Sequence, residues 1–160
     1  GQALLPAYGM GQIPFAIARG LNSTEMKIGV PVVEINGTSA VLADGTQEDG
    51  DAIIIATDGT TAEKLLGQTP SLRWRSTTTL YFSAADPPVE LPILVLNGSC
   101  RGVVRSLCVP SLLSEHYAPT DCHLVSITLN GYHEGDLHLV AREVKSELTS
   151  WFGNQVDTWK

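Results

Sequence analysis

The sequence lacks any apolar run that approaches the roughly 18 residues a helix needs to cross a membrane. The chain has 160 residues, of which 43% are hydrophobic and 17% are charged. These values are typical of globular domains, and a chain of this length buries a sufficient core without disulfides or structural metals. The composition therefore predicts a soluble globular protein without a transmembrane segment.

Basic residues are also scarce. Ten Lys and Arg stand against seventeen Asp and Glu, which gives a net charge of -7. No stretch interleaves basic with aromatic residues, as a surface that binds nucleic acid usually does. The sequence therefore argues against a nucleic-acid partner, and no pattern in it indicates an oligomeric state.

The chain has only three cysteines, Cys100, Cys108 and Cys122. Their number is odd and their spacing is not paired, which argues against a disulfide framework and for reduced thiols. We therefore expect a cytoplasmic protein, or one in a plastid-like compartment if a longer parent carries a transit peptide. Because the chain starts at Gly1 and not at methionine, we interpret it as an excised fragment of such a parent.

Motifs for a self-contained catalytic centre are absent from the sequence. Ser106 and Ser111 lack the flanking glycines of a hydrolase nucleophile turn. The four histidines match no metal-ligand spacing, and we interpret them as surface or hydrogen-bonded residues. They are His116, His123, His133 and His138. The sequence predicts no metal site and identifies no catalytic residue.

The first half has signals for a helix, a hairpin and a second helix. Apolar spacing predicts a helix over about 11–19, and Asn36-Gly37 between two apolar runs predicts a β-hairpin. Another turn is expected at Asp44-Gly45. The stretch 51–57 is continuously apolar for five residues, which predicts a strand buried on both faces. Capping oxygens at 57–60 then predict a helix that continues through Leu66.

The second half predicts a sheet followed by one helix. Strand-like runs occur around 74–84, 93–97, 103–109 and 124–129, separated by turn signals. The helix over about 136–151 should lie on that sheet, because its apolar residues form one stripe. The residues of this stripe are Leu137, Val140, Ala141, Val144, Leu148 and Trp151.

These elements predict an α+β fold with a mostly antiparallel sheet and a few helices. We expect two parts. Residues 1–67 contain the hairpin and the buried strand, and residues 68–160 contain the antiparallel sheet with the C-terminal helix.

Several stretches together resemble a known superfamily. Their order is similar to the central portion of the FAD-dependent amine oxidase, phytoene desaturase and protoporphyrinogen oxidase superfamily. The stretches of the first half are GMGQIPFAIA, IGVPVVEI, VLADG, DAIIIATD and AEKLL, and those of the second half are WRSTTTLYFSA and SLCVPSLLSEHYAP. The resemblance extends over nearly the whole chain.

This resemblance implies an FAD site and a substrate-binding domain. The residue that matches Val32 contacts the adenine end of FAD through its backbone in such flavoproteins. Ala56 and Thr57 would line the cofactor cleft. The sheet of the second half resembles the substrate-binding domain, whose strands form part of a wall over the isoalloxazine ring. The chain itself lacks the G-x-G-x-x-G turn and the acidic ribose-binding residue that complete a dinucleotide site.

The resemblance therefore implies a fragment of an FAD-dependent oxidoreductase with a small-molecule substrate. In amine-oxidising members a lysine bridges to the flavin through water, and the nearest counterpart here is Thr77 or a neighbour. A desaturase-like or dehydrogenase-like removal of hydride is thus favoured over amine oxidation. We expect weak or no FAD binding and no turnover by the fragment itself. The alternative is a stand-alone α+β binding or interaction module without catalysis.

Overall fold

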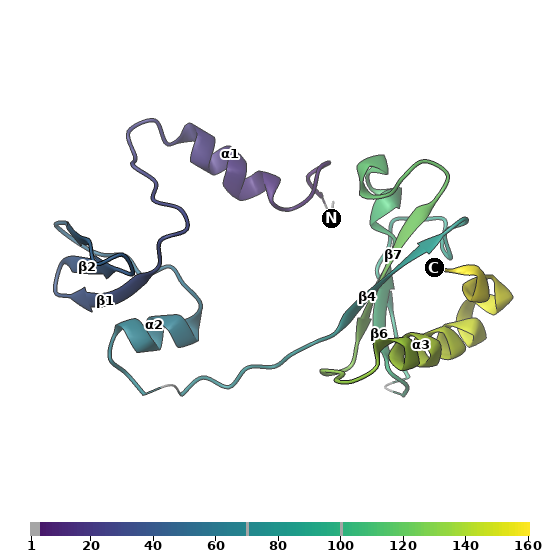
Figure 1. Cartoon of the computed structure of the whole chain (residues 1–160). Coiled ribbons are helices and arrows are strands. Elements are labelled where there is room, and N and C mark those ends of the chain that lie inside the picture. The colour runs from purple at the N-terminus through teal and green to yellow at the C-terminus, as the bar shows by residue number, and fades with distance from the viewer. Residues whose placement is uncertain (1–3, 70, 100) are drawn as a thin grey trace. The chain divides into compact units, whose positions relative to one another are not determined.

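The computed structural model describes residues 4–69, 71–99 and 101–160 and has an α+β fold (Figure 1). The chain divides into two compact units. We call Asn22–Trp74 the hairpin unit, and Gly1–Leu21 together with Arg75–Lys160 the sheet unit. Within the described residues, the structure contains no helix of the length and apolar character that membrane crossing requires.

The hairpin unit contains a three-stranded antiparallel sheet and one helix. Strands β1 (Val32–Asn36), β2 (Ser39–Leu42) and β3 (Gln47–Asp49) pair in the order β1-β2-β3. Gly37 has a φ of 63°, the left-handed conformation that a tight hairpin turn requires. This confirms the hairpin predicted from Asn36-Gly37. Helix α2 (Gly59–Leu65) follows, as its capping residues predicted.

The prediction of a buried strand at 51–57 was wrong. This segment has no regular secondary structure, and the side chain of Ile54 is 91% exposed. Ile53 and Ile55 are only half-buried. A strand needs a neighbour for its backbone groups, and no strand of the described residues pairs with this segment.

The sheet unit is built on four antiparallel strands, as predicted. They are β4 (Thr79–Ala84), β5 (Val95–Leu96), β6 (Val104–Cys108) and β7 (His123–Leu129). Their order is β4-β7-β6-β5, so the chain crosses over to place the last strand in the middle. Short 3-10 helices η1 (Pro110–Leu112) and η2 (Glu115–Tyr117) connect β6 to β7.

Helix α3 (Leu137–Phe152) packs on one face of this sheet, and the 3-10 helix η3 (Gly153–Thr158) follows it. Val144 and Leu148 are fully buried, and Val140 is 9% exposed. Leu137 was expected on the same stripe but is 57% exposed. Because Asp136 caps the helix just before it, Leu137 lies in the first turn, beyond the part of α3 that packs on the sheet.

Helix α1 (Gln12–Gly20) is present where the sequence predicts a helix, but none of its residues is buried. The segment before it is held against η2. The Tyr117 hydroxyl donates to the carbonyl of Pro6 at 2.9 Å, and the Tyr8 ring stacks on His116 with centroids 4.3 Å apart. These contacts attach the N-terminal segment to the sheet unit.

Candidate functional site

The three predicted cofactor-binding residues lie around one pocket of the hairpin unit. Val32 belongs to β1, while Ala56 and Thr57 belong to the segment before α2. The pocket encloses about 110 Å³. Its other walls are apolar except for backbone groups, and they come from Ile35, Ala40, Ile53, Ile54, Ile55 and Leu65.

This pocket is too small to be a complete cofactor site. Ligand pockets usually enclose roughly 300–1,000 Å³. Its apolar walls suit the face or edge of a flat ring, and the unpaired segment beside it leaves backbone N–H and C=O groups for a ligand. The residues present thus fit one end of a dinucleotide and no more.

The N-terminus of α2 does not suit the pyrophosphate of a dinucleotide. The Asp58 carboxylate accepts hydrogen bonds from the Thr61 amide at 3.1 Å and from the Thr61 hydroxyl at 2.6 Å. The hydroxyl bond, followed by the amide bond, lowers the pKa of Asp58 below the ordinary aspartate value. An ionised carboxylate therefore occupies the position where a phosphate would bind, and it would repel one.

The open face of the four-stranded sheet, opposite α3, carries two cross-strand rows of uncharged side chains. Phe82 and Ala84 of β4 face the core, so Tyr81 and Ser83 lie on the other side. Tyr81 is opposite Ser126 of β7, which is in turn opposite Cys108 of β6. Thr79, Thr128 and Ser106 form a second row of the same kind.

Cys108 is a weak nucleophile in this setting. Burial raises the pKa of its thiol, and a hydrogen bond with Ser126 opposes that shift only in part. A thiol with a raised pKa stays protonated at neutral pH, whereas the thiolate is the reactive form. These two rows therefore offer hydroxyls, a neutral thiol and the Tyr81 ring.

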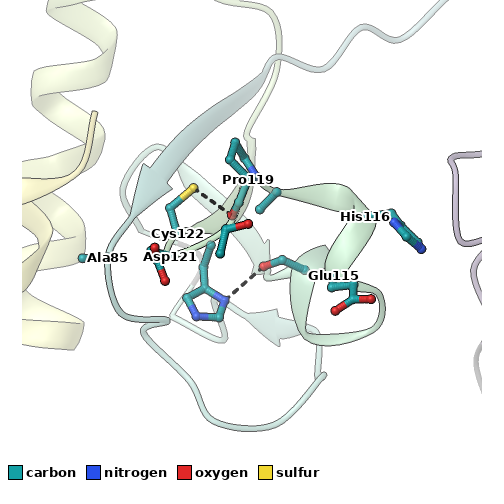
Figure 2. A pocket seen from close by; sticks show the side chains of 10 residues that line it. Ala85, Glu115, His116, Pro119, Asp121 and Cys122 are labelled. Carbon is teal, nitrogen blue, oxygen red and sulfur yellow. Dashed lines mark hydrogen bonds between the residues drawn. The ribbon is translucent and has the colours of Figure 1, made fainter.

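A larger pocket of about 640 Å³ lies where β7 begins, beside η1 and η2 (Figure 2). In it, the Ser111 hydroxyl lies 3.2 Å from His123 Nδ1 and accepts a hydrogen bond from the Leu124 amide at 3.1 Å. Cys122 Sγ donates to the carbonyl of Pro119. His116 points away from Cys122 and Asp121.

This larger pocket does not assemble a catalytic triad. The Ser111 oxygen accepts from the Leu124 amide and lies within hydrogen-bond distance of His123, but no carboxylate among the described residues hydrogen-bonds to His123 to orient its ring. The described residues contain no group of three His, Cys, Asp or Glu side chains that could hold a metal ion. Sequence reasoning missed the Ser111–His123 pair, because no motif connects two residues that only the fold brings together.

Comparison with known proteins decides the family. The family model for flavin-containing amine oxidoreductases matches residues 1–159. The chain belongs to this family. A search of curated proteins found no match.

The fold of this chain is also similar to that of a solved structure. The crystal structure of the PF1083 protein from Pyrococcus furiosus superposes with a TM-score of 0.59 at 16% sequence identity. The match covers 77% of this chain and 33% of that chain. At this identity the likeness shows the fold alone, and our chain spans about a third of the length of that protein.

Proposed function

We propose that this chain is part of a longer FAD-dependent oxidoreductase, to which it contributes a substrate-binding domain and one wall of the FAD site. The observation that carries the proposal is the family match over residues 1–159 together with the pocket that gathers Val32, Ala56 and Thr57. When bound, the flavin would accept a hydride from the substrate. The residues of this chain would hold one end of the cofactor and position the substrate.

Exposed apolar surface supports a longer protein. Ile54 is 91% exposed, and Ile17 of α1 is 61% exposed on a helix that buries nothing. A nine-residue helix is only marginally stable in water without a packing partner. Both features are explained if the remainder of an FAD domain covers them.

We assign residues 1–67 to the FAD-domain side and residues 68–160 to the substrate domain. The hydroxyls and the neutral thiol in the two rows of the open face support a substrate whose reacting part is uncharged, since a cationic amine would favour a nearby carboxylate. Thr77 or a neighbour corresponds to the amine oxidase lysine by resemblance, and Thr77 is exposed and lies just before β4. We therefore favour desaturase-like or dehydrogenase-like chemistry over amine oxidation.

Chemical-shift mapping of the isolated chain tests the FAD wall. We expect millimolar AMP and FAD to shift the backbone resonances of Val32, Ala56 and Thr57, because the adenine end would occupy the pocket. Riboflavin, which lacks adenine, is the matched control ligand and should leave these resonances unchanged. Equal shifts with riboflavin, or shifts confined to the pocket of Figure 2, would contradict the assignment.

A further inference from the structure

The last residue of the chain already pairs with the edge of the four-stranded sheet. The Ser83 amide donates to the carbonyl of Lys160 at 2.8 Å, and the Lys160 amide donates to the carbonyl of Ser83 at 3.0 Å. Two residues that exchange both hydrogen bonds form the closely spaced pair of an antiparallel ladder. Lys160 is thus positioned as the first residue of a strand beside β4.

The rest of that edge is open. Strand β4 is the outermost strand of its sheet. Thr78 directs both backbone groups toward the β7 side, where it pairs with Leu129 and Gly131. Backbone direction alternates along a strand, so Thr79 and Tyr81 direct theirs to the same side as Ser83. Both are exposed, and no other segment among the described residues hydrogen-bonds to them there.

We propose that the β4 edge is a docking site for one more antiparallel strand, an extended segment that continues directly from Lys160. The Ser83–Lys160 pair fixes the register of that strand. Its second residue after Lys160 pairs with Tyr81, and its fourth pairs with Thr79. This inference rests on the proposed function in one respect, that a longer flavoprotein supplies the segment.

The side chains of β4 define the chemistry of the incoming strand. Phe82 is 6% exposed and faces the core, and Leu80 packs against the same core. The first and third residues after Lys160 share their face, so they should be apolar and preferably β-branched. Tyr81 is 65% exposed on the open face. The second and fourth residues lie beside it and should be polar or aromatic.

A second copy of this chain fits the edge less well. Two β4 strands paired antiparallel about Tyr81 would place Ser83 of each copy opposite Thr79 of the other. Ser83 already uses both of its edge groups on Lys160. Such a dimer would therefore have to break that pair, whereas a segment continuous with Lys160 extends it.

Two C-terminal extensions of the chain test the proposal by amide hydrogen exchange. One adds Val-Thr-Val-Thr after Lys160. The matched control adds Val-Pro-Val-Pro, which lacks an N–H at the second and fourth positions. We expect the first extension to slow exchange of the Tyr81 and Thr79 amides at least tenfold relative to the control. Exchange of the Ala62 amide, within α2 of the hairpin unit, should not differ between them.

Equal exchange of Tyr81 and Thr79 in both extensions would overturn the proposal. Protection of the same amides in the unextended chain, accompanied by a dimer in sedimentation, would also overturn it in favour of a second copy. Slow exchange of Ile127, a fully buried residue of β7, verifies in each variant that the sheet unit is folded. No flavin is added here, and the FAD mapping uses the unextended chain, so failure of one proposal is distinguishable from failure of the other.

Discussion

At the scale of single residues, one carboxylate organises the loop between β5 and β6. Glu147 of α3 accepts hydrogen bonds from the Val103 amide at 2.8 Å, the Val104 amide at 3.1 Å and the Asn97 side chain at 3.2 Å. Gly102 has a φ of 81°, and a Cβ at this position would lie 2.4 Å from Glu147 Oε1. The loop therefore needs both the carboxylate and a residue without a side chain.

Replacement of Glu147 with Gln should destabilise the sheet unit. The amide keeps the size of the carboxylate but offers one acceptor oxygen in place of two. If that oxygen keeps the Val103 and Val104 amides, which share Oε2, the NH₂ group faces the Asn97 side-chain donor. We expect a loss of about 1–3 kcal/mol in the free energy of unfolding, measured by denaturant titration. Glu143→Gln is the matched control, because Glu143 is exposed on the same helix. An equal effect of both changes would refute the role of Glu147.

Sequence reasoning did not identify these residue-scale contacts. Glu147 is 44 residues from Val103, and Ser111 is 12 residues from His123. Neither separation follows a helical or strand period, so only the tertiary fold brings the partners together. The role of Gly102 could not be predicted from the sequence either. A turn and a close approach to another side chain both favour glycine, and the sequence does not distinguish between them.

At the scale of elements, the sequence predicted a strand or helix correctly where the strands and helices that pack on it lie within the chain. The strands of the sheet unit have their neighbours and α3 beside them, and their alternating pattern identified them correctly. The segment 51–57 has an equally clear apolar pattern but no paired strand among the described residues. An apolar pattern indicates that a segment is buried, but it does not show whether the residues that cover it belong to the same chain. In the described residues nothing covers Ile54, whose side chain is exposed.

Replacement of Val144 with Asp tests the buried stripe of α3. Val144 is fully buried against the sheet, so the variant places an unpaired charge in the core. We expect a loss of about 3 kcal/mol or more in the free energy of unfolding, visible as a lower melting temperature. Ser146→Asp introduces the same side chain at an exposed position of α3 and should leave melting nearly unchanged. Unaltered melting of Val144→Asp would mean that the stripe is not buried.

The Asp58 cap predicts an acid-sensitive helix α2. Because hydrogen bonds from Thr61 lower the pKa of Asp58 in the folded chain, its stabilisation is present above the ordinary aspartate pKa of about 3.9. It is lost as the pH falls through the lowered value. The protection of the Thr61 and Ala62 amides against exchange should therefore fall on acidification, and less so in Asp58→Ala. Asp51→Ala, at an exposed position of the same unit, should behave like the unchanged chain.

At the scale of the whole molecule, the two units differ in how much each buries. The sheet unit has a continuous core between its sheet, α3 and the C-terminal residues. In the described part of the hairpin unit, Leu42 is the one large hydrophobic side chain that is buried. This contrast agrees with a hairpin unit that completes its core against another part of a longer flavoprotein, whereas the sheet unit supplies its own.

The last prediction follows from the partial nature of the cofactor site. Dinucleotide affinity in such folds comes largely from backbone N–H groups and a helix N-terminus at the pyrophosphate. In this chain the N-terminus of α2 is occupied by the Asp58 carboxylate, and the pocket at Val32 encloses only about 110 Å³. We therefore expect the isolated chain to bind FAD no more tightly than millimolar and to have no turnover. The longer protein that we propose would bind FAD tightly and turn over its substrate. Titration of FAD into the purified chain, followed by flavin fluorescence, measures this directly. Saturable binding at micromolar or tighter affinity would mean that the chain holds a complete FAD site, and the proposal of a partial one would then be wrong.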